Sequence, residues 1–430
     1  MKSRISILGC LSVLIVLVGA SCAWAASSSG LKAGAARIDI TPDQPVTMSG
    51  YAARKELSTG VHDPLSARVL AFEAGGKRLV LVSTDLIGFY GGTADHMRQA
   101  LLREFRLEPG ELFLAGIHTH AGPTLTIDKE NGHPNNLEYT QKLKGKLLDV
   151  VRQAMNAMEP VTLGLGVGHS PMGANRRELR VTTRGESSIV LGRDPYGPTD
   201  KEVLVLKVAK ADGTLQAVAF DYATHATCLG GRNLTISGDV LGLAEQFVEK
   251  ILGSDVIAPA FAGASGNINP WFRGLTGFDT TAGWVPEPVL LGTFLGQEVV
   301  HVCRGIGRTG PADKIDAAFV KLPLPAKPSA DAAKKKEAPG TVPFTVTVAR
   351  LGDVAFVGLG AEVCTEIGVA IKAGSPCPHT FVITHCNAAA GYVAPKELHV
   401  PGGYEITSSP FAPEAADVLI REAIRMLHRL

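Results

Sequence analysis

Two histidines, His118 and His120, stand two positions apart at the end of the apolar run 112-LFLAGIHTH-120. On an extended chain, side chains two positions apart point to the same face. A His-x-His pair at the end of a strand is a common way to offer metal ligands from a rigid base. It is also the pattern of a polar strand terminus, so the pair by itself leaves both interpretations open.

Two more residues of the metal-ligand type follow other apolar runs. His225 ends 216-QAVAFDYATH-225, and its neighbours are small or carry hydroxyls, which would let a metal approach; a core histidine is the alternative. Glu362 follows an apolar run and a glycine-rich turn. The alternative for Glu362 is a carboxylate that interacts favourably with a helix N-terminus. Two histidines and one carboxylate with an open position are the ligand pattern of a catalytic zinc site.

The elements that must position these residues alternate along the chain. Strand-like runs cover 78–86, 112–120, 203–209, 216–225, 255–264, 354–360 and 380–387, and helical patterns cover 94–105, 137–158, 240–252 and 413–430. Near-continuous Val, Ile and Leu runs between helices predict an α/β fold of layered mixed β-sheets flanked by helices. The run 344–360, which turns at Gly352 and Asp353, predicts an antiparallel hairpin within it.

Polar and ligand-type residues come just past the carboxyl ends of several of these runs. They are His118, His120, His225, residues 265–269, Glu362 and Tyr392. In open α/β sheets, sites are built at the edge where strands end. We therefore expect these residues to share one site.

The bulk composition is that of an ordinary globular protein. The 430 residues carry a formal net charge of +1, with 45% hydrophobic and 19% charged residues. Because there is no basic excess, no nucleic acid partner is expected. Of the seven cysteines, Cys10 and Cys22 lie near the N-terminus and the others have no CxxC spacing. Neither a disulfide framework nor a cysteine-based zinc site is expected.

The N-terminus has the pattern of a secretory signal peptide, residues 1–25. Lys2 and Arg4 precede an apolar run, and Ala23-Trp24-Ala25 offers a small-x-small cleavage site. The protein is thus predicted to be secreted or periplasmic, with a retained anchor and a lipoprotein modified at Cys22 as alternatives. Residues 26–430 are predicted to form one catalytic domain, with an exposed Pro, Ala and Lys-rich loop at about 323–343.

The motifs together resemble those of the neutral, non-lysosomal ceramidases. The resemblance spans nearly the whole mature chain, and HTHAGP with ATHAT is its most specific part. The matching segments, in order, are 36–54, 61–72, 118–123, 175–176, 222–227, 261–270, Glu362 and 391–393.

The resemblance implies a zinc-dependent amidase. It implies that His118, His225, Glu362 and Tyr392 hold one Zn²⁺ ion, and that His120 is the acid/base residue beside it. It further implies that Arg176 and Tyr404 face the substrate or developing charge. Asp85 and Asp239 are candidates to orient a ligand histidine from the second shell, and a helix cap is the preferred role of Asp239.

Two departures from the family pattern concern the substrate. The ceramidases have a GDVSP stretch whose serine is needed for activity, and the corresponding residue here is Asn269. Asparagine has no hydroxyl to deliver, but it can still donate a hydrogen bond in the site. The ceramidases also have a C-terminal immunoglobulin-like domain, which this chain is expected to lack because it ends in the helix at 413–430.

Three functions follow from these residues. The first is an exported zinc hydrolase of an amide bond in an N-acyl, ceramide-like compound. The second is the same metal site acting on an ester, lactone or glycan-related bond, and the third is a non-catalytic binding protein that retains the fold. The expected partner is a small-molecule or lipid-like substrate, with peripheral membrane contact as a compatible addition; the oligomeric state is left open.

Overall fold

Strongly apolar strands place their side chains alternately into two cores, as the two-residue period of a strand requires. The computed structural model describes residues 30–271, 287–328 and 340–430. In β4 (Lys77–Thr84), Val80 belongs to one core and Leu81 to another. Because this strand is buried on both faces, its sheet lies between two other layers.

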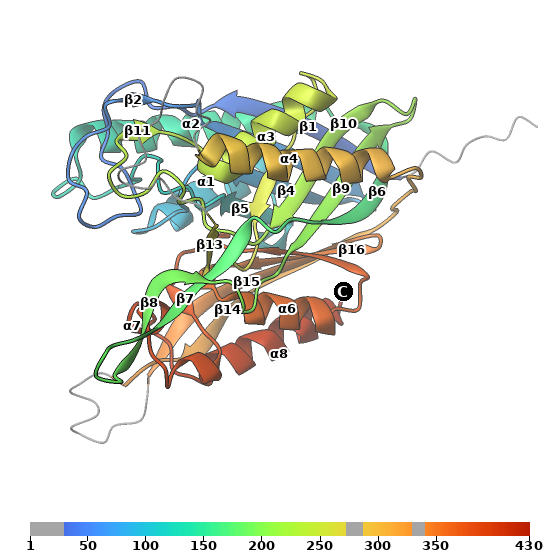
Figure 1. Ribbon diagram of the computed structural model, residues 1–430. Coiled ribbons are helices and arrows are strands. Elements are labelled where there is room, and N and C mark those ends of the chain that lie inside the picture. The colour runs from blue at the N-terminus through green and yellow to red at the C-terminus, as the bar shows by residue number, and fades with distance from the viewer. Residues whose placement is uncertain (1–29, 272–286, 329–339) are drawn as a thin grey trace, which may run out of the picture.

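The sheet that contains β4 has eight strands in the described residues and is the larger of the two main sheets (Figure 1). Its strand order is β12 (Ala260–Ala262), β10 (Leu215–Tyr222), β9 (Glu202–Lys210), β6 (Glu159–His169), β1 (Lys32–Asp39), β3 (Ser66–Ala74), β4 and β5 (Leu112–Gly116). Most neighbours are antiparallel, but β5 runs parallel to β4 and β12 runs parallel to β10. The carboxyl ends within each parallel pair therefore meet at one sheet edge.

A second sheet packs against the first. Its four strands, in spatial order, are β14 (Ile315–Pro325), β15 (Thr341–Leu351), β16 (Val354–Leu359) and β18 (His379–Ile383). The hairpin expected at Gly352 is confirmed, because β15 and β16 are antiparallel and joined there. Phe113 of the larger sheet meets Phe356 of the smaller one edge to face, with ring centroids 6.3 Å apart. Apolar contacts of this kind join the two sheets face to face.

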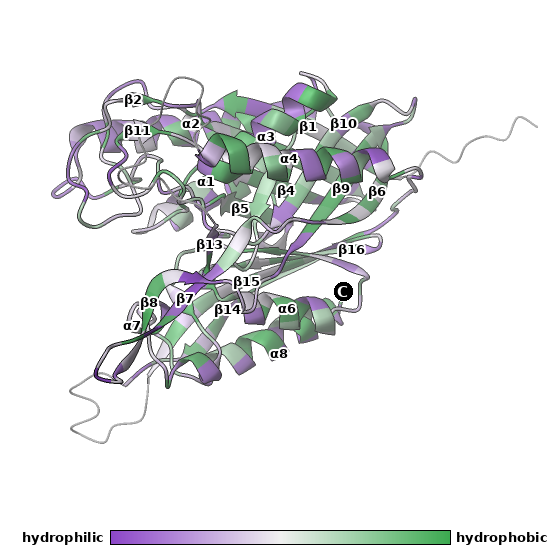
Figure 2. Cartoon of the chain, in the orientation of Figure 1, coloured by the Kyte–Doolittle hydropathy of each residue, from purple (hydrophilic) through white to green (hydrophobic). Residues whose placement is uncertain are grey.

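Helices cover the outer face of each sheet (Figure 1). The larger sheet is covered by α1 (Thr93–Phe105), α2 (Pro134–Asn156), α3 (Asp239–Leu252) and α4 (Glu287–Gly305), and the smaller sheet by α6 (Thr365–Gly374) and α8 (Ala415–Leu427). Each of these helices carries both apolar and hydrophilic residues, as expected when one side packs on a sheet (Figure 2). The layered α/β fold with mixed sheets and flanking helices is thus confirmed.

Short elements complete the edge where several strands end. They are the sheet β13 (Ile268–Pro270), β7 (Gly173–Val181) and β8 (Ser187–Asp194); the pair β17 (Glu362–Val363) and β19 (Tyr392–Val393); the pair β2 (Gly60–Val61) and β11 (Thr235–Ile236); the helix α7 (Tyr404–Thr407); and two 3₁₀ turns at Pro109–Glu111 and Lys396–Leu398. Most of the candidate functional residues lie on these short elements or on the loops beside them.

The expected loop at about 323–343 is wrong at both ends. Residues 323–325 and 341–343 belong to β14 and β15, where Pro323 pairs with Pro343 across an antiparallel ladder. Composition hid these strand ends because prolines interrupt the apolar pattern. Residues 329–339, and the predicted signal peptide at 1–25, lie outside the described residues. Within the described part of the chain, no helix has the length and apolarity needed to cross a membrane.

A buried carboxylate on β10 makes the stability of the fold depend on pH. Burial raises the pKa of Asp221 to about 7, and the Lys372 ammonium 4.0 Å away opposes only part of this effect. The Oδ1 atom of Asp221 has no hydrogen-bond partner among the described residues. Since its pKa is raised on folding, Asp221 favours the folded state most at low pH. That contribution is lost as the pH rises from about 4 through 7.

The Asp221→Asn variant is therefore expected to gain stability over the wild type as the pH rises through this window. With about 1.4 kcal/mol per pKa unit, the gain approaches but does not exceed about 4 kcal/mol above pH 7. Urea denaturation from pH 4 to pH 8 measures it, and the exposed Asp255→Asn variant serves as the control. A constant difference between Asp221→Asn and the wild type at every pH would contradict the expectation.

Candidate functional site

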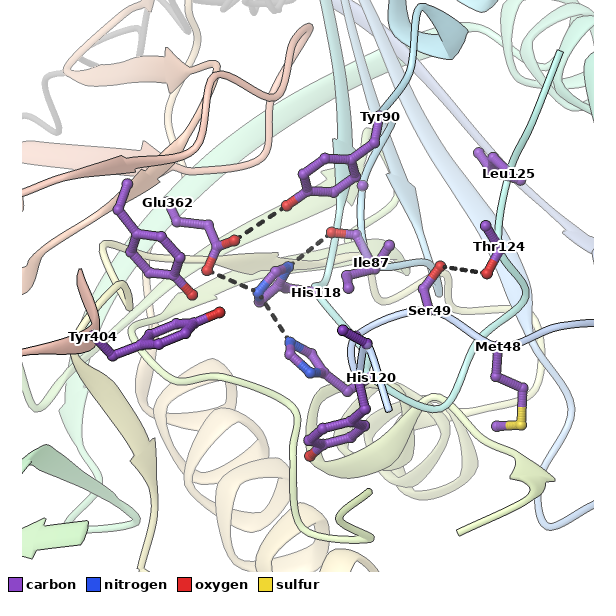
Figure 3. Close-up of a pocket in the computed structure, with 15 residues that line it drawn as sticks. Met48, Ser49, Ile87, Tyr90, His118, His120, Thr124, Leu125, Glu362 and Tyr404 are labelled. Carbon is purple, nitrogen blue, oxygen red and sulfur yellow. Dashed lines mark hydrogen bonds and ion pairs between the residues drawn. The ribbon is translucent and has the colours of Figure 1, made fainter. Parts of the chain in front are cut away.

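His118 projects its ring from the end of β5 in a fixed orientation. Its backbone adopts a left-handed conformation, with φ 65°, and its N–H donates to the carbonyl of Leu86 at 2.9 Å. Its ring Nδ1 lies 2.8 Å from the carbonyl oxygen of Ile87 (Figure 3). Because a carbonyl can only accept, Nδ1 carries the hydrogen, and Nε2 is the ring nitrogen that faces the site.

His120 lies beside His118 and not on an unrelated surface. The strand-like loop that carries both runs next to the loop after β10, and the His120 N–H donates to the Ala226 carbonyl at 3.0 Å. Nε2 of His120 lies 3.2 Å from Nε2 of His118 (Figure 3). Gly50, with φ 101°, makes room for this ring, since a Cβ there would come within 2.5 Å of it. The two histidine rings are thus adjacent, as expected, although the backbone between them turns and is not extended.

His225 reaches the same place from the end of β10. Its N–H donates to the carbonyl of Ile268 at 3.0 Å, which joins this loop to β13. Its ring Nδ1 lies 2.7 Å from the carbonyl of Ser265, so Nδ1 again carries the hydrogen and Nε2 is bare. His225 is completely buried. Two histidines that follow different strands therefore present the same ring nitrogen, Nε2, to the site.

Glu362 and Tyr392 enter from the other side, on β17 and β19. These two strands are parallel, and their register pairs Glu362 directly with Tyr392. Oε2 of Glu362 lies 3.3 Å from Nε2 of both His118 and His225. Oε1 accepts a hydrogen bond from the Tyr90 hydroxyl at 3.3 Å (Figure 3). One carboxylate oxygen is thus fixed by a phenol while the other faces the two imidazoles.

The atoms that meet here are of the kinds that bind a metal ion. Nε2 of His118 and Nε2 of His225 face one carboxylate oxygen, and Glu362 Oε2 has no hydrogen-bond partner among the described residues. A buried carboxylate oxygen in this position is stabilised by positive charge nearby, on a bound cation or on an imidazole. The ring nitrogens of His118, His120 and His225 also lie within 4.8 Å of one another, so these three form a second candidate ligand set. The site therefore fits a metal ion.

The protonation states suit metal ligands at neutral pH. Burial and the nearby Arg176 guanidinium lower the pKa of His225 to about 4. Burial alone would raise the pKa of Glu362, but His118 and His225 outweigh it, and the pKa lies well below its ordinary value. Metal ligands must be neutral imidazoles and ionised carboxylates. His225 and Glu362 have these forms at neutral pH.

Arg176 and its partners form the wall beside His225. Its Nη1 lies 3.2 Å from His225 Nε2, and its Nη2 donates to the Tyr392 hydroxyl at 3.2 Å. Its Nε donates to Glu405 at 2.7 Å, which anchors the buried guanidinium. Asn269 Oδ1 lies 3.4 Å from Nη1 of the same arginine. The predicted site residues Arg176 and Asn269 are thus brought together with the histidines.

Tyr404 lines a cavity of about 370 Å³ together with Tyr392, His118, His120 and Glu362. Its ring meets that of Tyr392 edge to face, with centroids 5.5 Å apart, and the side chain is about half exposed. Apolar and aromatic side chains complete the lining, among them Met48, Tyr51, Ile87, Tyr90 and Leu125. The cavity is large enough for a small organic group next to the donor atoms.

The structure contradicts the expected second-shell role of Asp85. The histidine rings are oriented by backbone carbonyls, whereas Asp85 accepts from the Ser66 N–H at 2.7 Å and pairs with the buried Arg68 at 3.3 Å. Asp239 is the first residue of α3, and Gly238 is its N-cap. The Asp239 carboxylate instead accepts the N–H of Cys228 and of Leu229, so it holds the loop that follows His225.

Sequence patterns missed Tyr90 as a site residue. Tyr90 stands in a glycine-flanked stretch after β4, with no strand or helix periodicity to mark its direction. Its position becomes informative only when β4, β5 and β17 are folded together, because its hydroxyl then meets Glu362. The five cysteines of the described residues are all free and buried, in agreement with the expected lack of a disulfide framework.

The fold and the site together define a layered α/β protein with a buried candidate metal centre at the edge where its strands end. Residues 31–275 match the family model of the neutral/alkaline non-lysosomal ceramidases, N-terminal region. This match covers more than half of the chain and includes His118, His120 and His225. The protein belongs to this ceramidase family.

Similar proteins agree with this assignment. The neutral ceramidase of rice is 27% identical over 259 residues, which are 55% of this chain and 31% of that protein. Neutral ceramidase 1 of Arabidopsis thaliana is 28% identical over 252 residues, again 55% and 31% of the two chains. The neutral ceramidase of Mycobacterium tuberculosis is 24% identical over 274 residues, 56% and 39% of the two chains. The matched part is thus about a third of each relative.

Solved structures extend the likeness to nearly the whole chain. The crystal structure of the neutral ceramidase from Pseudomonas aeruginosa covers 93% of this chain, which corresponds to 75% of that one, with a TM-score of 0.73 and 19% identity. A ceramidase complexed with C2 covers 93% and 76%, with a TM-score of 0.72 and 18% identity. These likenesses establish the fold also for the part that carries Glu362, Tyr392 and Tyr404.

Proposed function

We propose that this protein is an exported, zinc-dependent hydrolase that cleaves the amide bond of an N-acyl, ceramide-like substrate. The observation that carries the proposal is the convergence of the Nε2 atoms of His118 and His225 on Oε2 of Glu362, each 3.3 Å away. Two imidazoles, one carboxylate and an adjacent open cavity match the ligand pattern of catalytic zinc. Tyr392, paired with Glu362 across β17 and β19, is the proposed fourth ligand.

The residues around the ligands have separate roles. A bound zinc ion would supply a Lewis acid and lower the pKa of a bound water to about 7. His120 would accept the proton from the attacking water and return it to the leaving amine. Burial and His118 hold its pKa well below the ordinary value, so the ring is neutral and one of its nitrogens is free to accept a proton.

Arg176 and Tyr404 would bind the substrate and stabilise negative charge on the carbonyl oxygen. Arg176 is buried, is held by Glu405 and donates to the Tyr392 hydroxyl, which lines the cavity, so its charge lies in a water-poor place where a hydrogen bond to developing charge is strongest. The Tyr404 ring, which is half exposed and lines the cavity, would contact the part of the substrate outside the reacting bond.

The proposed substrate class rests on the family and on the cavity walls. The relatives are named neutral ceramidases, and a protein of similar fold was solved with C2. The aromatic and apolar side chains beside the candidate ligands favour an acyl chain next to a polar bond. Asn269, in place of the family serine, donates no hydroxyl hydrogen but offers an amide beside Arg176. For this reason an ester or lactone of similar shape is the second candidate substrate.

Export is part of the same proposal. Lys2, Arg4 and the apolar run before Ala25 support removal of the first 25 residues at a membrane-bound signal peptidase. The mass of the protein recovered from the periplasm or medium is expected to be that of a chain beginning at Ala26.

The test combines metal analysis with a substrate panel. The purified protein is expected to contain zinc at close to one equivalent, measured by inductively coupled plasma mass spectrometry. A short-chain N-acyl sphingosine, an ester with the same acyl chain, a lactone and a glycan would be assayed with and without a chelator. Amide turnover that stops with chelator and returns with added zinc supports the proposal.

Three outcomes would overturn it. Turnover of the ester or lactone with the amide inert would replace the amide by the second candidate bond. Zinc bound at one equivalent without turnover of any compound would instead favour a binding protein that retains the fold. Turnover unaffected by chelator, in protein that contains no metal, would remove the zinc site from the mechanism.

A further inference from the structure

A fourth histidine, His385, packs on the candidate metal centre from the smaller sheet. It follows β18 and is 1% exposed. Its ring lies parallel to that of His118, with centroids 3.7 Å apart and an interplanar angle of 10°. The two stacked rings come from different sheets, so the contact joins the two layers at the edge where the site is built.

The backbone around His385 is fixed on several sides. The Thr384 N–H donates to Ala262 of β12 at 2.9 Å, and the Cys386 N–H donates to Leu359 of β16 at 3.1 Å. The Asn387 N–H donates to Leu114 of β5 at 2.8 Å. His385 itself has a left-handed backbone, with φ 53°, which is uncommon for a residue other than glycine. A backbone held in this conformation by its neighbours leaves the ring little freedom.

The ring of His385 makes no hydrogen bond that would explain its presence. Both of its nitrogens lack a hydrogen-bond partner among the described residues. An unpaired buried polar group costs about 1–3 kcal/mol, and the strained backbone adds to that cost. His385 also stands apart from the group of histidines whose nitrogens converge, since that group consists of His118, His120 and His225. Its contact with the site is therefore made by the face of the ring.

Gly88 also lies close to the His385 side chain. A Cβ at Gly88, where φ is 127°, would lie 3.4 Å from Cβ of His385 and 3.3 Å from the Tyr90 ring. The side chain of His385 is thus stacked on the His118 ring and lies beside the Gly88 backbone. The loop 86–90 also supplies the carbonyl that holds His118 Nδ1.

We propose that His385 is a positioning residue that sets the plane of the His118 ring by stacking. The hydrogen bond from Nδ1 to Ile87 fixes one point of the His118 ring but leaves rotation about that bond open. The parallel ring of His385 packs against the His118 ring and prevents this rotation. Nε2 of His118 therefore remains directed at Glu362. Outer partners that orient a ligand histidine usually form hydrogen bonds, and here a flat face has that role.

The experiment measures metal affinity and ligand geometry in two variants. His385→Leu keeps an apolar side chain of similar size but removes the flat face, whereas His385→Phe keeps a flat face and removes the nitrogens. The zinc dissociation constant is measured by competition with a chromogenic chelator. His385→Leu is expected to bind zinc roughly 10–100-fold more weakly than the wild type, as when an outer partner is lost. His385→Phe is expected to stay close to the wild type.

A spectroscopic readout and a matched control separate positioning from loss of stability. Cobalt-substituted His385→Leu is expected to show altered visible bands, because the His118 nitrogen is no longer held in place. Cys386→Ala removes the next buried side chain, which faces Gly358 and Phe113 and not His118. It is expected to lower the melting temperature of the metal-free protein without changing the zinc affinity or the cobalt spectrum.

The outcomes distinguish this inference from the proposed zinc site on which it rests. If the wild type binds zinc and His385→Leu binds it equally well with an unchanged cobalt spectrum, the positioning role is wrong and the site stands. If His385→Phe binds zinc as weakly as His385→Leu, the ring nitrogens of His385 and not its stacked face position His118. That result also overturns the stacking proposal. If Cys386→Ala lowers the zinc affinity as much as His385→Leu does, the loss comes from general destabilisation and the positioning role is wrong. A wild type without metal would refute the proposed function itself.

Discussion

Replacing His118 by alanine is expected to abolish stoichiometric metal binding and, with it, hydrolysis. The Nε2 atom of His118 is 3.3 Å from Glu362 Oε2 and 3.2 Å from His120 Nε2, so it stands at the centre of the donor group. Its removal takes away the nitrogen that lies close to both Glu362 and His120. The loss of affinity should exceed the roughly 10–100-fold cost of losing an outer partner. Equilibrium dialysis with zinc measures the affinity, and turnover of the active substrate is followed in parallel.

The control for His118→Ala is His301→Ala. His301 is exposed on α4, away from the cavity, so its replacement removes an imidazole without touching the site. This variant is expected to keep both metal and activity. Circular dichroism of the metal-free proteins shows whether His118→Ala is folded, which matters because the side chain is buried. Metal bound at one equivalent by folded His118→Ala would mean that His118 is not a ligand.

The candidate ligands differ in how well the sequence alone could predict them. His118 and His120 are marked by local pattern, because a buried strand of five residues ends just before them and their spacing places them together. His225 is marked in the same way by the end of β10. The apolar periodicity of strands also predicted the layers, since it depends only on which residues are buried on both faces. These features depend only on neighbouring residues in the sequence, so they can be predicted without knowledge of the fold.

The contacts among residues of the second half of the site could not be derived from local pattern. Tyr404 follows no apolar run and is predicted from the family resemblance alone, whereas Tyr392 is marked by its place past a strand-like run and owes only its ligand role to the resemblance. Glu362 meets Tyr392 because β17 and β19 pair in parallel, thirty residues apart in the sequence, and such pairing has no local mark. His385 was missed for the same reason. Its strand was predicted, but its partner His118 lies on another sheet.

The wrong prediction for Asp85 has a similar cause. A carboxylate at the end of a strand before a predicted ligand is a reasonable candidate to orient a histidine. The structure instead pairs Asp85 with Arg68, an arginine on the neighbouring β3 that is fully buried and also binds Glu245 and Glu249. The pairing of Asp85 with Arg68 depends on the register of their strands, and the sequence around Asp85 does not indicate that register.

Replacing His120 by alanine is expected to leave the metal bound and to lower kcat by about 10²–10⁴-fold, the usual loss when a general acid/base is removed. His120 is less buried than His118, and its ring lies on the cavity wall, edge to face with Tyr51 at 5.1 Å. Its Nδ1 has no hydrogen-bond partner among the described residues, whereas Nδ1 of His118 and of His225 is held by a carbonyl. A ring not held in this way suits proton transfer better than rigid ligation.

The competing assignment makes His120 the third nitrogen ligand, since its ring nitrogen lies within 4.8 Å of those of His118 and His225. The two assignments differ in metal affinity. If His120 moves protons, His120→Ala retains one equivalent of zinc with an affinity close to that of the wild type, while turnover falls. If His120 is a ligand, His120→Ala loses metal to the same extent as His118→Ala, which would contradict the assignment.

Chemical rescue adds a readout that does not depend on metal content. The side chain lost in His120→Ala opens space next to a cavity of about 370 Å³, which is large enough to admit free imidazole. Added imidazole is expected to restore part of kcat in His120→Ala, because a mobile base can take the place of the missing ring. It should restore nothing in His118→Ala, where the defect is loss of the ion. Rescue of both variants, or of neither, would show that the two histidines do not divide ligation and proton transfer between them.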